Sequence, residues 1–329
     1  NDESTLRQVF GLLVHAHYRT TPSDLHRILD APNLKVHALM HHGLLVAATL
    51  VAHEGALPLD TCEALYWGRT RIRGHALPET IIGHLGRRRA GSLSMIRSVR
   101  IAVHPDLRRK GLATRLVEEI HTHYQPDLFG TLFGVTPELL QFRRSVGYEL
   151  VRLGASRGNR TGEPAAVMVR PVSERAQSLF HEMRADLARD LPLQFELLQS
   201  NDDLHIDPRL FAALLFELPE ASRLSTEERD SMVAAFAFGP RTQESVATAL
   251  VSYLNEYLHV VPSLDERERL LLVGRLASGT SWGELMATVG LPSLSATMRA
   301  MRRAMRALIV EADPSLTERT GVPDSNMHL

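Results

Sequence analysis

The chain has 329 residues, of which 44% are hydrophobic and 23% charged, and its formal net charge is −1. This composition is ordinary for a soluble globular protein, and the length predicts two domains. The longest apolar runs, such as residues 44–52, are too short to span a bilayer, so we expect no membrane partner. Cys62 is the only cysteine, which excludes an intrachain disulfide and fits a reducing, cytoplasmic location.

The two halves of the chain carry opposite charge. Residues 1–172 contain 22 Lys and Arg against 15 Asp and Glu, whereas residues 173–329 contain 15 against 23. A basic first half suits an anionic cofactor and a nucleic-acid substrate. Only Lys35 and Lys110 are lysines, however, so the arginine-rich composition of a high-GC genome is the more economical explanation.

The first half alternates helical and strand patterns. Apolar spacing predicts a helix over residues 4–16, a second helix from Pro22 to near Pro32, and a hairpin over 35–52. An inserted helix is expected over 75–85, followed by a buried strand at 99–103 and a helix from residue 112. A strand at 128–135, a short helix ending at Gly147 and strands at 148–153 and 165–171 follow. This order predicts an α/β fold with a mixed sheet.

From Ser173 onward strand signals stop and helical periodicity dominates. It predicts helices over residues 174–190, 207–217, 225–237, 242–258, 264–278, 281–289 and 293–311. We therefore expect an α/β domain over residues 1–172, an all-α C-terminal domain over 173–313, and a flexible tail over 314–329.

Residues 97–116 are the most specific segment of the chain. A β-branched strand ends at His104-Pro105, and Arg108-x-x-Gly111-x-Ala113 leads directly into an amphipathic helix. The first N–H groups of a helix lack intrahelical partners and carry partial positive charge, so this arrangement predicts a pyrophosphate site. The glycine patterns of the Rossmann and P-loop nucleotide sites occur nowhere in the sequence.

The same strand, turn and helix resemble the acetyl-CoA-binding motif of the GNAT acyltransferases. The resemblance implies a GNAT-type mixed β-sheet flanked by helices, with acetyl-CoA as the cofactor. It places the pantetheine arm along Ile101, Ala102 and Val103, with an N–H from Val103 polarising the thioester carbonyl. The implied pyrophosphate site comprises Arg108, Arg109, Lys110, Gly111, Leu112, Ala113 and Thr114.

A narrower resemblance covers about residues 10–190. Several segments of the chain are similar to the tRNA(Met) cytidine acetyltransferase family. They are residues 12–25 (LLVHAHYRTTPSDL), 29–32 (LDAP), Arg71-x-Arg73-Gly74-His75, 133–139 (FGVTPEL) and 147–154. That family acetylates the exocyclic amine of the wobble cytidine in elongator methionine tRNA. Its members carry a helicase-like ATPase module before this domain, so we expect a piece of a longer protein, with ATP used only by the missing module.

The resemblance also implies roles for single residues. His17 is the candidate catalytic or cytidine-positioning histidine, because imidazole titrates near neutrality, and Arg109 is the principal pyrophosphate ligand at the active site. Glu138 is the further cofactor contact. Many GNAT enzymes have a proton-donating tyrosine where this chain has Arg143, and the family's second arginine is replaced by Ser145, so Arg144 is expected to substitute for it.

Basic clusters predict where RNA binds. Arg299, Arg302, Arg303 and Arg306 share one helical face, opposite a packing face of Met298, Met301, Met305 and Leu308. With Arg71, Arg73, Arg87, Arg88 and Arg89 they form the candidate tRNA surface, although a solvated basic face would have the same spacing. No histidine cluster has the spacing of a metal site. The alternative function is acetylation of a protein or small-molecule amine, and the sequence leaves the oligomeric state open.

Overall fold

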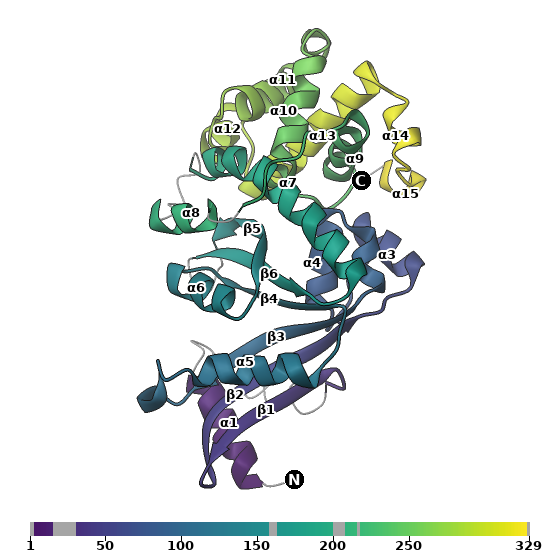
Figure 1. Ribbon diagram of the computed structural model, residues 1–329. Helices are drawn as coiled ribbons and strands as arrows, with labels where there is room; N and C mark the ends of the chain where they lie inside the picture. The colour runs from purple at the N-terminus through teal and green to yellow at the C-terminus, as the bar shows by residue number, and fades with distance from the viewer. Residues whose placement is uncertain (1–2, 16–30, 158–162, 200–207, 216–217, 328–329) are drawn as a thin grey trace.

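The computed structural model describes residues 3–15, 31–157, 163–199, 208–215 and 218–327 (Figure 1). Its centre is one six-stranded sheet in the order β1-β2-β3-β4-β6-β5. The strands are β1 Leu34–His41, β2 Leu44–Gly55, β3 Ser94–Val103, β4 Leu128–Gly134, β5 Glu149–Arg157 and β6 Pro164–Pro171. Only β3 and β4 pair in parallel among these strands, which confirms the predicted mixed sheet.

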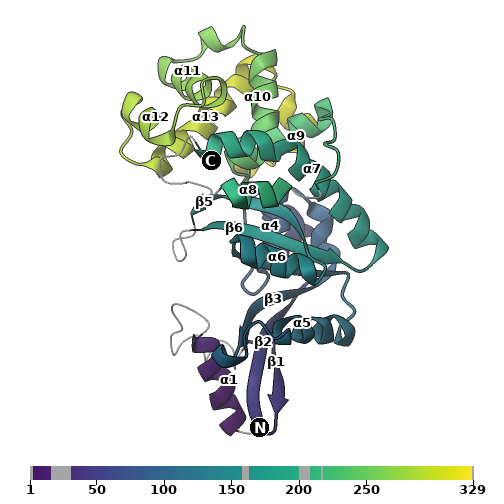
Figure 2. The same cartoon turned by 60° about the vertical axis from the view of Figure 1, so that its left-hand side comes forward.

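Helices cover both faces of the sheet. In sequence order they are α1 Glu3–His15, α3 Leu59–Tyr66, α4 Ala76–Leu85, α5 Leu112–His123 and α6 Pro137–Ser145, with short 3₁₀ turns at Arg88–Ser92 and Pro105–Leu107. Figure 2 shows α1 and α5 on opposite sides of β2 and β3. The apolar residues Val117 and Ile120 of α5 pack with Leu140 of α6 and Phe129 of β4. The face that carries α5 and α6 is therefore closed by a common core.

The C-terminal part is helical, as predicted. Its elements are α7 Glu174–Gln199, α8 Pro208–Leu215, α9 Thr226–Ala237, α10 Ala247–Glu256, α11 Glu266–Leu272, α12 Trp282–Thr288 and α13 Leu294–Ala312. Short turns lie at Gln243–Val246 and Val261–Ser263, and a π-helical segment at Val273–Ala277 extends α11. Reciprocal capping boxes begin α9, α11 and α12, each pairing a Ser or Asp with a Glu three residues later.

Packing is continuous between the sheet and the helical part. Arg184 of α7 donates to the carbonyl of Leu150 at 2.9 Å, and Gln194 donates to that of Leu153 at 2.8 Å. One buried cluster contains Trp67 and Leu77 from the first part together with Phe236 and Met305 from the second. The expected division after residue 172 is thus a change of secondary structure rather than a break between two cores.

The segment after residue 313, which the sequence predicted to be a flexible tail, is packed. It forms α14 Leu316–Arg319 and α15 Asp324–Met327. Leu316 is fully buried, and Asn326 donates to the carbonyls of Trp67 (2.9 Å) and Phe238 (2.7 Å). The prediction failed because single buried residues in a polar segment give no periodic signal.

Candidate functional site

The N-terminus of α5 forms an open backbone cradle. Gly111 caps the helix with φ 77°, and its carbonyl accepts the N–H of Arg115 at 2.9 Å. Arg115 is thus the first residue of the helix whose N–H has an intrahelical acceptor, and the N–H groups of residues 112–114 have none. A Cβ built on Gly111 meets no heavy atom within 4 Å, so the space in front of the loop is open. Such a concave set of N–H groups binds anions.

The loop before this helix adds full positive charges. Arg108, Arg109 and Lys110 are all exposed, and Arg109 has a left-handed φ of 60°, which a non-glycine residue adopts rarely. The 3₁₀ turn before them is closed by the N–H of Leu107, which donates to His104 O at 2.9 Å. Leu112, Ala113 and Thr114 follow half-buried in the first turn of α5. The arrangement can bind an anion with several oxygens, such as a pyrophosphate.

β3 and β4 separate next to this cradle. They pair only from Met95 to Ser98 of β3 and from Leu128 to Thr131 of β4, although β3 continues to Val103 and β4 to Gly134. A register shift opposite Leu50 and Val51 gives β3 a bulge at Val99. The opening leaves one edge of β3 unpaired over its last residues.

The ladder pattern tells which backbone groups face this opening. His104 donates to Val46 O at 2.9 Å, so this pair is hydrogen-bonded toward β2. Hydrogen-bonded and non-hydrogen-bonded pairs alternate along an antiparallel ladder. The next pair, Val103 with Ala47, and the pair Ile101 with Thr49 are therefore non-bonded, and the N–H and C=O groups of Ile101 and Val103 point toward β4. An extended amide-containing chain can pair with this edge.

Buried polar side chains gather where the two strands part. Arg143 of α6 donates from Nη2 to Ser98 Oγ at 3.2 Å, and Tyr148 Oη lies 3.1 Å from Nε2 of His121. Burial raises the pKa of Tyr148 to about 12, whereas burial, aided by Arg170 and Arg143, lowers the pKa of His121 to about 4. Tyr148 and His121 are both neutral near pH 7.

Comparison with known proteins agrees with this geometry. Residues 8–129 match the family model described as GNAT acetyltransferase 2. The chain is 37% identical over 318 residues to a tRNA(Met) cytidine acetyltransferase of Nitrosococcus halophilus, covering 94% of this chain and 42% of that protein. It is 35% identical to a protein of the same name from Haloferax volcanii, covering 94% of this chain and 41% of the relative. The chain belongs to the tRNA(Met) cytidine acetyltransferase family.

The chain thus spans about two-fifths of the length of these relatives. A third family member, from Haloarcula marismortui, is 45% identical over 180 residues, or 54% of this chain. The GNAT-type sheet, the strand opening and the cradle after β3 confirm the fold class expected from the sequence.

The two cofactor contacts expected on α6 lie on different faces of that helix. Glu138 is exposed in the first turn, and Arg144 is half-buried in the last turn. Six residues separate them, which is about 9 Å along the axis and about 120° around it. The helix geometry alone therefore does not place the two side chains next to each other.

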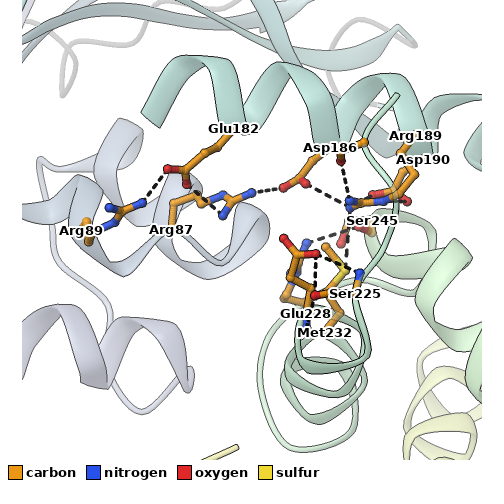
Figure 3. Close-up of polar contacts among 12 residues, drawn as sticks. Arg87, Arg89, Glu182, Asp186, Arg189, Asp190, Ser225, Glu228, Met232 and Ser245 are labelled. Carbon is orange, nitrogen blue, oxygen red and sulfur yellow. Dashed lines mark hydrogen bonds and ion pairs between the residues drawn. The ribbon is translucent and has the colours of Figure 1, made fainter. Parts of the chain in front are cut away.

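Arg87, Arg88 and Arg89, predicted to bind RNA, contact other parts of the protein. Figure 3 shows Arg87 ion-paired with Glu182 and Asp186 of α7, and Arg89 paired with Glu182 at 2.6 Å. Arg88 stacks 3.6 Å from the ring centroid of Tyr66. The network continues from Asp186 to Arg189 at 3.1 Å. This cluster fastens the segment after α4 to α7, whereas Arg71 and Arg73 are exposed.

The basic face of α13 is divided between solvent and protein. Arg299 and Arg303 are exposed, as predicted. Arg302 instead donates to the carbonyls of Phe236, Gly239 and Arg241, and Arg306 donates to that of Ala237. Burial lowers the pKa of Arg302 to about 10. On the packing face Met301, Met305 and Leu308 are buried, but Met298 is exposed, contrary to the prediction.

The remaining predictions concern the catalytic histidine, a metal site and a membrane-spanning helix. His17, the candidate catalytic histidine, lies outside the described residues, as does the predicted helix from Pro22. Within the described ranges, no group of three His, Cys, Asp or Glu side chains could hold a metal ion. The same part of the chain contains no helix long and apolar enough to cross a membrane.

Sequence reasoning missed a cavity of about 830 Å³ on the α1 side of the sheet. It is lined by Gln8, Leu12, Leu45, His104 and Arg108, among others, and so adjoins the loop that leads to the cradle. Its walls come from three segments far apart in sequence, and no local pattern indicates such a cavity. The local feature that could have indicated it is Leu44, a large apolar residue that is exposed at the start of β2.

Proposed function

We propose that this chain transfers an acetyl group from acetyl-CoA to the exocyclic N4 amine of a cytidine in tRNA. The observation that carries the proposal is the succession of an open strand edge and an anion cradle on one strand–loop–helix unit. This order suits a ligand with a pyrophosphate at one end and an extended amide arm at the other. The choice of tRNA as acceptor is supported by the names of the relatives.

Cofactor binding is assigned residue by residue. The pyrophosphate binds to backbone N–H groups and to positively charged side chains. The N–H groups are those of Gly111, Leu112, Ala113 and Thr114, and the charges are those of Arg108, Arg109 and Lys110. The unpaired edges of Ile101 and Val103 bind the pantetheine amides, with Ala102 between them. An N–H of this edge, from Ile101 or Val103, polarises the thioester carbonyl. Glu138 and Arg144 supply further contacts from α6.

The chemistry requires positioning and a route for one proton. The cytidine amine is a weak nucleophile because its lone pair is delocalised into the ring. Its nitrogen attacks the thioester carbonyl, the C–S bond then breaks, and the amine loses a proton. His17 is the candidate acceptor of that proton or the group that positions the cytidine.

The tRNA is held by exposed arginines. Arg302 and Arg306 donate to backbone carbonyls, whereas four other arginines are exposed and offer phosphate contacts: Arg71, Arg73, Arg299 and Arg303. The modified nucleotide is the wobble cytidine of elongator methionine tRNA, and the reaction takes place in the cytoplasm. Any dependence of the reaction on ATP comes from the part of the longer relatives that this chain does not cover.

The test is a direct product analysis. The chain is incubated with isotopically labelled acetyl-CoA and transcribed methionine tRNA, and the digested nucleosides are analysed by mass spectrometry. We expect labelled N4-acetylcytidine, which should disappear when the wobble cytidine is replaced by uridine. Labelled protein or polyamine without acetylcytidine would favour the alternative amine acetyltransferase. Calorimetric binding of acetyl-CoA, measured separately, tests the cofactor assignment without tRNA.

A further inference from the structure

Arg143 is a buried cation without a counter-charge. Its side chain is 6% exposed, and Nη2 donates to the neutral Ser98 hydroxyl. Nη1 is buried and has no hydrogen-bond partner in the described part of the chain. No carboxylate among those residues forms an ion pair with it, although a buried charge is normally paired. The protein thus maintains an unfavourable group at this position.

The neighbours of Arg143 do not supply the missing charge. The rings of Phe142 and Tyr148 lie with their centroids 5.4 and 5.7 Å from its guanidinium carbon. Tyr148 and its partner His121 are both neutral near pH 7. Arg170, which also acts electrostatically on both of them, is a second cation. An anion brought to Nη1 would therefore meet a positive environment.

Arg143 lies beside the opening between β3 and β4. Ser98 and Thr131 form the last pair of β3 and β4, so the guanidinium lies at the closed end of the opening. The cradle of α5 lies beyond the open end, after Val103. A cofactor whose pyrophosphate occupies the cradle extends its thioester toward the closed end, along the edges of Val103 and Ile101.

We propose that Arg143 stabilises the thiolate of CoA as it leaves, through the unpartnered Nη1 and its permanent charge; this rests on the proposed function. The amine nitrogen bonds to the acetyl carbon, and the C–S bond breaks with its electron pair on sulfur. The amine proton passes to a base. Arg143 keeps its protons, because a guanidinium is not an acid in this pH range, and the thiolate takes its proton from water after release. Charge stabilisation here takes the place of proton donation.

The test measures the acidity of bound CoA. The ultraviolet absorbance of the thiolate is followed against pH for the chain saturated with CoA, with the desulfo-CoA complex as blank. The protein's own Cys62 contributes little, because burial raises the pKa of its thiol. We expect the bound thiol to titrate at least about one pH unit below the thiol of free CoA, titrated in the same buffer as the reference.

Three variants locate the effect. Arg143→Gln should return the bound thiol to its free value, Arg143→Lys should retain part of the shift, and Arg267→Gln, an exposed arginine on α11, should change nothing. The acetyl-transfer kcat of Arg143→Gln should fall about a hundredfold, as when one oxyanion donor is removed, with a smaller change in KM. Equal titration of bound CoA in Arg143→Gln and the unaltered chain would overturn the proposal.

A second measurement needs no variant, in case Arg143→Gln does not fold. CoA can lose a thiol proton, whereas desulfo-CoA cannot. As the pH rises from the pKa of the bound thiol to that of the free thiol, the affinity for CoA should therefore rise about tenfold relative to the affinity for desulfo-CoA. A ratio that does not change with pH would also overturn the proposal. If CoA does not bind the unaltered chain, the cofactor assignment fails and this inference with it. Normal CoA binding and thiol shift without acetylcytidine would refute the tRNA acceptor alone.

Discussion

Arg302 provides the sharpest test of how α13 is held, because its guanidinium contacts three backbone carbonyls at and after the end of α9. It donates to Gly239 O at 2.8 Å and to Arg241 O at 2.7 Å, in addition to Phe236 O. Hydrogen bonds of charged groups contribute about 1.5–3 kcal/mol each. Since Arg302 keeps some contact with solvent, we take the lower part of that range and expect Arg302→Ala to reduce the free energy of unfolding by about 3–5 kcal/mol.

The matched control is Arg303→Ala, one residue further along the same helix and exposed. Surface changes of this kind alter stability by about 0.5 kcal/mol or less. Urea and thermal unfolding of both variants are the assay, and a melting temperature roughly 4–7 °C lower is expected for Arg302→Ala alone. If the two variants unfold together, the carbonyl contacts do not stabilise the fold and Arg302 is available for another role.

The remaining predictions concern the cofactor, pH and RNA. Gly111→Ala should raise the Kd for acetyl-CoA about five- to thirtyfold, because a left-handed φ costs an alanine about 1–2 kcal/mol; calorimetry showing unchanged affinity would contradict the cradle. His121 is neutral when folded and has a pKa near 4, whereas its unfolded value is 6.5, so its contribution to stability is complete above pH 6.5 and is lost as the pH falls toward 4. His121→Phe should remove roughly 1.4 kcal/mol per pH unit from the slope of the unfolding free energy in that window, and an unchanged slope would rule this out. Replacing Arg299 and Arg303 together by Gln should weaken tRNA binding and reduce its salt dependence by about two phosphate contacts, measured by filter binding at several salt concentrations; equal slopes would remove these arginines from the RNA surface.

Local sequence patterns were sufficient to predict those helices, strands and turns whose conformation depends on residues within the element itself. The Gly111 turn and the order of strands were predictable because β-branched runs, glycine turns and capping boxes act within a few positions. The helices of the C-terminal part were found for the same reason, to within a few residues at their ends, except that α7 continues through Pro192 to Gln199, nine residues past its predicted end. Even the half-buried first turn of α5 follows from its amphipathic spacing.

The side-chain roles of the arginines could not be read from spacing. Arg302 and Arg303 are adjacent and chemically identical, yet one meets three carbonyls and the other meets solvent. The difference depends on where the end of α9 lies, which is a tertiary property. The same holds for Arg143, whose burial beside Ser98 depends on the packing of α6 against β3.

Asn326 has a consequence for how the chain acquires its fold. Its amide joins the carbonyl of Trp67, 259 positions earlier in the sequence, to that of Phe238. During synthesis the carbonyl of Trp67, which directly follows α3, can gain this partner only after residue 326 has been added, and contacts of such sequence separation slow folding. Removal of α15 should leave a partly assembled intermediate with the end of α3 exposed, even though that helix is complete in sequence by residue 66.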